Sequence, residues 1–221
     1  MASGAKSAET RARILEAAME LFRRQGFEET TMREIAAEAE VATGAAYYYF
    51  ESKDAIVLAF YERSLHDMEP MLEAALSASK NLKDRIAAIL EVKLKYFEPN
   101  RRLLGALAAH ADPEHALSPF SGQTRAIREQ DMKFFERALA SGRTLIPPDL
   151  QRHLPRILWM YQMGLILFWI YDRSQGQSRT HSLVAKSVPI VARLVKLAGL
   201  PLMQPVRKMV AELMDGVLET G

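Results

Sequence analysis

Residues 30–53 read T-T-M-R-E-I-A-A-E-A-E-V-A-T-G-A-A-Y-Y-Y-F-E-S-K. Within this stretch, Ile35, Ala36 and Ala39 follow the i, i+1, i+4 spacing of one buried helix face. Their small side chains allow a second helix to cross closely over the first, and Val41 fills the turn between them. The pattern predicts a short helix, a tight turn and a second helix crowded with aromatic residues.

The ends of these two helices carry matching signals. Thr30 or Thr31 offers a hydroxyl to the free N–H groups at the start of the first helix, and Glu34 completes a capping box with Thr31. In the second helix, Ala46 and Phe50 face inward at i and i+4. The residues that remain available outside are Tyr47, Tyr48 and Lys53. The stretch therefore predicts a helix-turn-helix, whose second helix lies in the major groove of DNA.

The spacing closely resembles the tetracycline-repressor family, whose pattern here is roughly T-x-x-x-I-A-x-x-A-G-V-S-x-G-x-x-Y-x-Y-F-x-S-K. The matching residues are Thr31, Ile35, Ala36, Ala39, Val41, Gly44, Tyr47, Tyr49, Phe50, Ser52 and Lys53. The resemblance implies a transcriptional regulator, most often a repressor. It also implies a homodimer, in which the last two long helices of each subunit pair into a four-helix bundle. Such a dimer presents two recognition helices to a palindromic operator.

Two positions depart from the family pattern. Glu40 stands where the family has a glycine in the left-handed region, and a non-glycine residue costs roughly 1 kcal/mol there. Ala42 stands where a serine often caps the recognition helix, so we expect Thr43 to cap it instead, one residue later. These departures make the choice of groove-facing residues depend on where the second helix begins.

Composition sets broad limits. The chain has 221 residues, of which 49% are hydrophobic, so it can bury a substantial core. It contains no cysteine, which excludes disulfides and thiolate metal sites. The first nine residues are small and polar and do not resemble a signal peptide, so we expect a cytoplasmic protein.

Charge does not single out a DNA-binding segment. Residues 1–64 hold eight lysine and arginine residues against eleven aspartate and glutamate residues, a balance of −3. A basic patch is the usual signature of a DNA-binding domain. DNA binding remains possible if the basic residues gather on one side and the glutamates face away from it. The residues that would line this basic side are Lys6, Arg11, Arg33 and Lys53.

Beyond the motif, helical periodicity continues to the end of the chain, with no strand pattern. Residues 1–8 are expected to be disordered, and a strong amphipathic helix is expected over 10–25. A helix starting at Ser52 and Lys53 follows the motif. Further helices are predicted over 81–98, 101–111, 123–140, 154–171, 179–198 and 205–219. We therefore expect an all-α protein with a helix-turn-helix domain over 1–53 and a helical ligand-binding and dimerisation domain over 54–221.

The most apolar segment is 154–171, which leaves two interpretations. Its continuous apolar run is shorter than the ~20 residues that a bilayer requires, and Gln162 interrupts it. A helix that is apolar all round is more often buried in a core or an interface. We expect burial, no membrane partner, and a dimer interface within residues 154–198.

The resemblance also assigns DNA contacts. Thr31 and Tyr47 correspond to positions that bind phosphate through hydroxyls, and Tyr49 and Lys53 to further backbone contacts. Arg33 corresponds to a position that reaches a base edge or a phosphate. The groove-facing surface is expected to consist of Thr43, Gly44, Ala45 and Tyr48. Two alternatives stay open: Tyr49 as half-buried support for Phe50, and Arg33 as a solvated charge.

An effector pocket is implied among the helices between residues 81 and 170. Its expected lining is Tyr96, Phe97, Phe134, Phe135, Trp159, Met163 and Phe168, with His110 and Gln162 as polar groups. Because few charges are expected on the inward faces, a largely apolar or aromatic small molecule fits such a pocket. The alternative is that these aromatic residues form ordinary core.

Catalytic signals are weak. His110, Asp112, Glu114 and His115 form the one cluster suggestive of a metal or acid–base site, but Pro113 breaks the helix that would align them, so a solvated loop is the competing interpretation. No phosphate-binding loop, nucleophile elbow or zinc-protease motif occurs. We expect no enzyme activity, metal or cofactor. The rival to a DNA-binding regulator is a homodimeric small-molecule-binding protein on the same scaffold without specific DNA binding.

Overall fold

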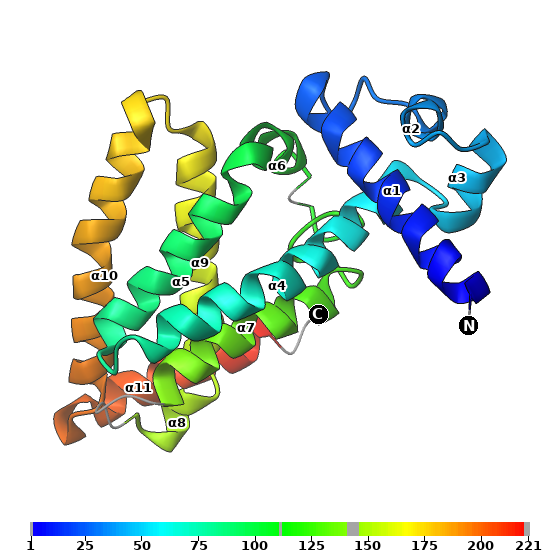
Figure 1. Cartoon of the computed structure of the whole chain (residues 1–221). Coiled ribbons are helices and arrows are strands. Elements are labelled where there is room, and N and C mark those ends of the chain that lie inside the picture. The colour runs from blue at the N-terminus through cyan, green and yellow to red at the C-terminus, as the bar shows by residue number, and fades with distance from the viewer. Residues whose placement is uncertain (1, 111, 141–145, 219–221) are drawn as a thin grey trace. The chain divides into compact units, whose positions relative to one another are not determined.

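The computed structural model describes residues 2–110, 112–140 and 146–218, and all regular structure within these ranges is helical (Figure 1). The expectation of an all-α protein is therefore confirmed. The chain divides into two compact units that are not continuous in sequence. The first comprises the residues up to 67 together with 97–128, and the second comprises 68–96 and the residues from 129 onward.

The first unit contains the predicted helix-turn-helix. Its elements are α1 (Ala2–Arg24), α2 (Met32–Glu38), α3 (Thr43–Tyr49), the first part of α4 (Lys53–Ser77), η1 (Glu98–Asn100) and α6 (Arg101–Leu107). The expectation of disorder over residues 1–8 is wrong for residues 2–8, which continue α1 as helix, while Met1 lies outside the described residues. Three of these seven residues are alanine, the strongest helix former, and they favour helix even without burial.

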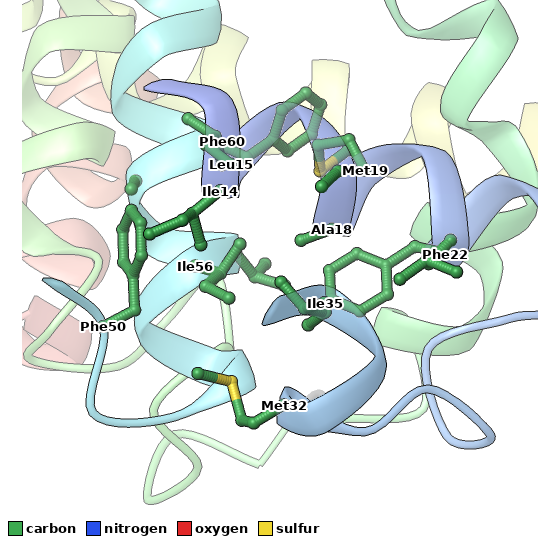
Figure 2. Close-up of a cluster of buried hydrophobic side chains, with 14 of the residues drawn as sticks. Ile14, Leu15, Ala18, Met19, Phe22, Met32, Ile35, Phe50, Ile56 and Phe60 are labelled. Atoms are coloured by element: carbon green, nitrogen blue, oxygen red, sulfur yellow. The ribbon is translucent and has the colours of Figure 1, made fainter. Parts of the chain in front are cut away.

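The core of the first unit gathers the apolar faces of its helices (Figure 2). Ile14 and Ala18 of α1 face Ile35 of α2, and Phe50 and Ile56 close the cluster from the segment after α3. Leu103 and Leu107 of α6 and Leu117 join the same cluster, although they are distant in sequence. The buried positions of α1 recur with the helical period, which explains why this helix supports the motif.

The second unit is a helical bundle. Its elements are the rest of α4, α5 (Leu82–Phe97), α7 (Arg125–Ala140), α8 (Pro148–Gln151), α9 (Leu154–Tyr171), η2 (Gln175–Gln177), α10 (Ser178–Ala198), η3 (Pro201–Met203) and α11 (Gln204–Leu218). Most helix bounds lie within two residues of those expected. The helix expected over 101–111 is too long: α6 ends at Leu107, and residues 108–110 leave the helix through a turn. Residues 111 and 219, where two helices were expected to end, lie outside the described residues. The domain boundary expected after residue 53 remains a prediction.

A buried arginine fixes two helix ends in the second unit. The Arg85 guanidinium donates to the carbonyl oxygens of Leu76 at 2.8 Å and Ser79 at 3.2 Å, at the end of α4. It also donates to the Arg137 carbonyl oxygen near the end of α7, at 2.7 Å. Because the last carbonyls of a helix lack partners within the helix, one side chain here satisfies several of them.

The apolar segment 154–171 forms α9, whose side chains Leu158, Trp159, Gln162 and Leu165 are buried. Within the described residues, none of the helices has the length and apolar character needed to cross a membrane.

Candidate nucleic-acid interface

The start of α2 is held by the predicted capping box. The Glu34 backbone N–H donates to the Thr31 hydroxyl oxygen at 3.2 Å, and the Thr31 backbone N–H donates to the Glu34 carboxylate at 2.8 Å. The Thr31 hydroxyl also donates to that carboxylate at 2.8 Å, and these bonds hold the pKa of Glu34 below its ordinary value. Thr31 is nevertheless exposed, so its hydroxyl can exchange partners with a ligand.

The turn between α2 and α3 has the geometry expected from the family pattern. Glu40 has a φ of 53°, in the left-handed region that favours glycine. Val41 returns to the core and donates its N–H to the Ala36 carbonyl oxygen at 2.9 Å. Glu40 thus retains the turn that glycine makes elsewhere in the family, and the strain argued from the sequence is present.

The recognition helix α3 begins without a side-chain cap. Ala42 is its N-cap and offers no side-chain hydrogen bond, and Thr43 is already the first helical residue. The expectation that Thr43 caps the helix one residue later is wrong, because the extended backbone of Ala42 already accepts the first helical bonds from Ala45 and Ala46.

One face of α3 is buried and the other is open to solvent. Ala46 and the following Phe50 are buried, as predicted. Thr43 and Gly44 are exposed, and the side chains of Tyr47 and Tyr48 are 51% and 81% exposed. The open face therefore carries two aromatic hydroxyls beside two small residues.

Two residues that were predicted to contact DNA, Ala45 and Tyr49, are half-buried. Ala45 lies at the edge of the open face. Tyr49 packs against the core, and its ring meets that of Tyr48 edge to face, with centroids 5.1 Å apart. This packing supports the alternative in which Tyr49 orients its neighbours, and it also stiffens Tyr48.

Lys53 is the first residue of α4, and its side chain points back into the first unit. Its ammonium donates to the carbonyl oxygens of Phe27 at 2.7 Å and Glu28 at 3.2 Å. It also lies 4.6 Å from the centre of the Phe27 ring. Two of its three N–H groups are thus used inside the protein, and the predicted role of Lys53 at a phosphate remains a prediction.

Ion pairs inside the first unit join three of its arginines to four carboxylates. Arg23 pairs with Glu20, Arg24 with Glu38, and Arg63 with Glu16 and Asp67. Arg33, by contrast, is exposed on α2 and forms no ion pair within the described residues. Because an ion pair combines one charge of each sign, these pairs leave the balance of −3 over residues 1–64 unchanged, and Arg33 stays available as an exposed cation.

The predicted effector-binding residues are divided between the two units. Tyr96, Phe134, Trp159, Gln162 and Met163 belong to the second unit. Phe97 and His110 belong to the first, where Phe97 lies 6.1 Å from the ring of Phe60. Phe134, Trp159 and Gln162 are buried, whereas Tyr96 and Met163 are half-buried. Phe135 is fully buried, and Phe168 is exposed rather than turned inward.

A buried polar network in the second unit was missed by the sequence reasoning. Lys93 of α5 pairs with Asp131 of α7, and its ammonium also donates to the Gln162 side-chain oxygen of α9 at 2.6 Å. Gln162 in turn donates to Asp131 at 2.8 Å. Burial lowers the pKa of Lys93, and the carboxylate of Asp131 opposes that shift. The expectation of few inward charges overlooked Lys93, although it follows Ile86 and Ile89 on the apolar stripe of α5.

The residues singled out as a metal or acid–base site form a different arrangement. The rings of His110 and His115 stack 4.1 Å apart, and His110 lies 3.7 Å from the Glu28 carboxylate. In the part of the chain that the structure describes, no three histidine, cysteine, aspartate or glutamate side chains come together closely enough to hold a metal ion.

Helices α9 and α10 carry an uncovered apolar face. The exposed large side chains on it are Met160, Leu167, Phe168, Tyr171, Ile190, Leu194 and Leu197. The two helices are joined by a hydrogen bond of 2.5 Å between the Tyr161 and Ser187 hydroxyls. Within each helix these side chains recur with the helical period, and exposed apolar surface of this kind is typical of an interaction site.

The fold and its open face define a helix-turn-helix DNA-binding protein. Two family models match the chain: bacterial regulatory proteins, tetR family, over residues 14–60, and the tetracyclin repressor-like C-terminal domain over residues 85–213. The chain belongs to the tetR family of transcriptional regulators, as the motif indicated.

Among similar proteins, the probable regulator ArpR of Pseudomonas putida is 36% identical over 73% of this chain and 80% of its own length. The transcriptional repressor KstR of Mycolicibacterium smegmatis is 24% identical over 85% of this chain and 87% of its own. A similar fold occurs in the regulator FadR of Bacillus subtilis in complex with stearoyl-CoA, with a TM-score of 0.60, 14% identity, and coverage of 79% of this chain and 95% of that one.

Proposed function

We propose that this protein is a ligand-responsive transcriptional repressor that binds a palindromic operator as a homodimer. The observation that carries the proposal is the division of α3 into a buried face at Ala46 and an open face with Thr43, Gly44, Tyr47 and Tyr48. A helix that is fixed on one side and bare on the other fits the major groove. The hydroxyls of Thr31 and Tyr47 bind phosphate, and Arg33 binds a base edge or a phosphate.

Gly44 supports close approach to the bases. A Cβ atom added at Gly44 would meet no atom within 4 Å, so the packing of the free protein does not require a glycine there. A glycine inside a helix costs ~1 kcal/mol relative to alanine. A partner lying directly against Gly44 and Ala45 gives a reason for this cost, and their small size favours van der Waals contact with thymine methyl groups.

The dimer forms through the uncovered face of α9 and α10. Leu167 is 49% exposed and Leu194 is 59% exposed, and both lie on helices whose opposite sides are buried in the bundle. Two-fold pairing of this face with itself would cover these side chains and form a four-helix bundle.

The effector is a largely apolar molecule recognised in the second unit, near Phe134, Trp159 and Met163. Gln162 would serve it as a polar group by exchanging its bond to Lys93 or Asp131. Similarity in fold to a regulator that holds stearoyl-CoA is consistent with a lipid-like effector. The effector changes DNA affinity only by as much as it prefers one dimer conformation. Thermal-shift screening with apolar and charged compounds tests this assignment: stabilisation by strongly anionic compounds alone would contradict it.

A selection from random duplex DNA tests the operator claim, followed by affinity measurements on the selected sequence. We expect a palindromic site, bound by the wild type. Gly44→Ala should keep or raise stability yet weaken operator binding about tenfold, the scale of one lost base contact. Gly216→Ala is the matched control, since its added Cβ also meets no atom within 4 Å. Selection of no sequence would favour the rival, a ligand-binding dimer without specific DNA binding.

A further inference from the structure

Helix α1 extends well past the core that it supports. From Gly4 to Arg13 none of its side chains is buried, and the first buried residue is Ile14. Nearly three helical turns therefore lie beyond the hydrophobic cluster. The match to the family's DNA-binding model begins only at residue 14, so these turns lie outside the recognised motif.

Arg11 ties this extension to the recognition helix. It continues the stripe of α1 that contains Leu15, Ala18 and Phe22, at spacings of four, seven and eleven residues. Its guanidinium carbon lies 4.7 Å from the centre of the Phe50 ring. Phe50 is the C-cap of α3, so Arg11 lies at the C-terminal end of the recognition helix.

The hydrogen-bonding groups of Arg11 are not used within the described residues. Its contact is with a ring face, and it forms no ion pair or hydrogen bond there, in contrast to Arg24 of the same helix, which pairs with Glu38. A guanidinium on an aromatic face is held in place while its planar set of N–H donors stays available. That planar set matches the oxygens of a phosphate.

Two of the other cations expected on the same side, Lys53 and Lys6, are placed differently. Lys53 donates to two carbonyl oxygens of its own unit. Lys6 precedes Arg11 by five residues, which at about 100° per residue turns it roughly 140° away around the helix axis. The expectation that Lys6 and Arg11 line the same side is therefore wrong. Arg11 is the cation of α1 that the packing directs to α3.

We propose that Arg11 binds a DNA phosphate beside the C-terminal end of α3, as a contact additional to those of the helix-turn-helix motif. This inference rests on the proposed function, because it needs α3 to lie in the major groove. The seven residues of α3 span about 10 Å, less than the groove width of about 12 Å, so a long side chain beside the end of a helix lying in the groove is within reach of a bordering backbone.

The test is the salt dependence of DNA binding for the wild type, Arg11→Gln and Arg11→Lys. Each phosphate contact contributes about 0.9 to the slope of log affinity against log salt, so Arg11→Gln should reduce the slope of a dimer by about 2. Affinity should fall by the same factor on operator and on random DNA, because phosphate contacts carry no sequence information. Arg11→Lys should retain most of the slope.

Arg24→Gln is the matched control, an arginine of the same helix that already has an anionic partner, and it should leave the slope unchanged. A slope for Arg11→Gln equal to that of the wild type would overturn the inference. If the wild type shows no operator preference, the proposed function fails, while the slopes on random DNA still decide the role of Arg11. If the wild type binds no DNA at all, both are overturned.

Discussion

The Lys53 ammonium lies 2.7 Å from the Phe27 carbonyl oxygen and 4.6 Å from the centre of the Phe27 ring. The start of α4 is thereby fixed to the segment between α1 and α2. A lysine that the motif assigns to DNA also closes the unit that carries the recognition helix. Its removal should accordingly change two measurable properties.

Lys53→Ala should lower the free energy of unfolding by about 1.5 kcal/mol, the scale of a hydrogen bond to a charged group. Urea denaturation measures this loss, and Lys53→Arg, which keeps a cation, should lose less. In DNA binding, the alanine variant should weaken all sequences about equally. An altered base preference with an unchanged salt slope would show that Lys53 does not act as a backbone contact.

Glu40→Gly should stabilise the protein by up to about 1 kcal/mol. The gain arises because Glu40 has a φ of 53°, where a side chain is strained, and the greater freedom of glycine in the unfolded chain offsets part of it. Ala37→Gly, on the exposed side of α2, is the control and should cost about 1 kcal/mol. Equal losses in both variants would indicate that the turn stores no strain.

Asp131→Asn should be among the most destabilising changes in the second unit. It leaves the Lys93 ammonium, which is 2% exposed, without its anionic partner, and such a loss costs about 3 kcal/mol or more. The double variant Lys93→Met with Asp131→Leu should recover part of this stability. It removes both buried charges but leaves the buried Gln162 amide without its two partners. Calorimetry on the two variants decides the matter, and a double variant no better than the single one would contradict this account.

Acid should weaken the junction between α9 and α10. Hydrogen bonds from Ser174 and Thr180 hold the pKa of the Asp172 carboxyl well below its usual range. A depressed folded-state pKa contributes stability above the unfolded pKa of about 3.9, and this contribution is lost as the pH falls below it. The stability difference between the wild type and Asp172→Asn should therefore be present at pH 7 and shrink below about pH 4. A difference that stays constant in acid would contradict this role of Asp172.

Leu167→Glu or Leu194→Glu should produce monomers or aggregates, because both side chains lie on the proposed interface and a desolvated unpaired charge is costly there. Light scattering at micromolar concentration reports the change. Met71→Glu is the control, an exposed apolar residue on α4 rather than on α9 or α10, and it should remain dimeric. A wild-type protein that is monomeric at this concentration would refute the proposed interface.

Local signals in the sequence predicted the fold because they agree with one another. The capping box at Thr31 and Glu34, the apolar spacing of Ile35 and Ala36, and the inward Ala46 are each set by a few neighbouring residues. Contacts between distant segments were not predictable in this way. Lys53 finds the carbonyl oxygen of a residue 26 positions earlier, and Lys93 pairs with a residue 38 positions later. Periodicity places such a residue on a face but does not identify its partner.

The candidate site shows the same difference between local features, which the sequence predicts, and contacts between distant segments, which it does not. The exposure of Tyr47 and Tyr48 was predicted, because the inward positions Ala46 and Phe50 recur with the helical period and leave these two tyrosines outside. The stacking of Arg11 on Phe50 was not predicted, because it depends on how far α1 continues beyond the core. An alanine-rich start to a chain does not distinguish a helix from disorder without its surroundings.

The most direct measurement of the central claim is a footprint of the wild-type protein on its selected DNA. We expect two protected half-sites related by two-fold symmetry, with centres separated by whole turns of about 10.5 base pairs, and two protomers bound per site. Protection of one asymmetric segment, or no protection above that on random DNA at any salt concentration, would contradict the account.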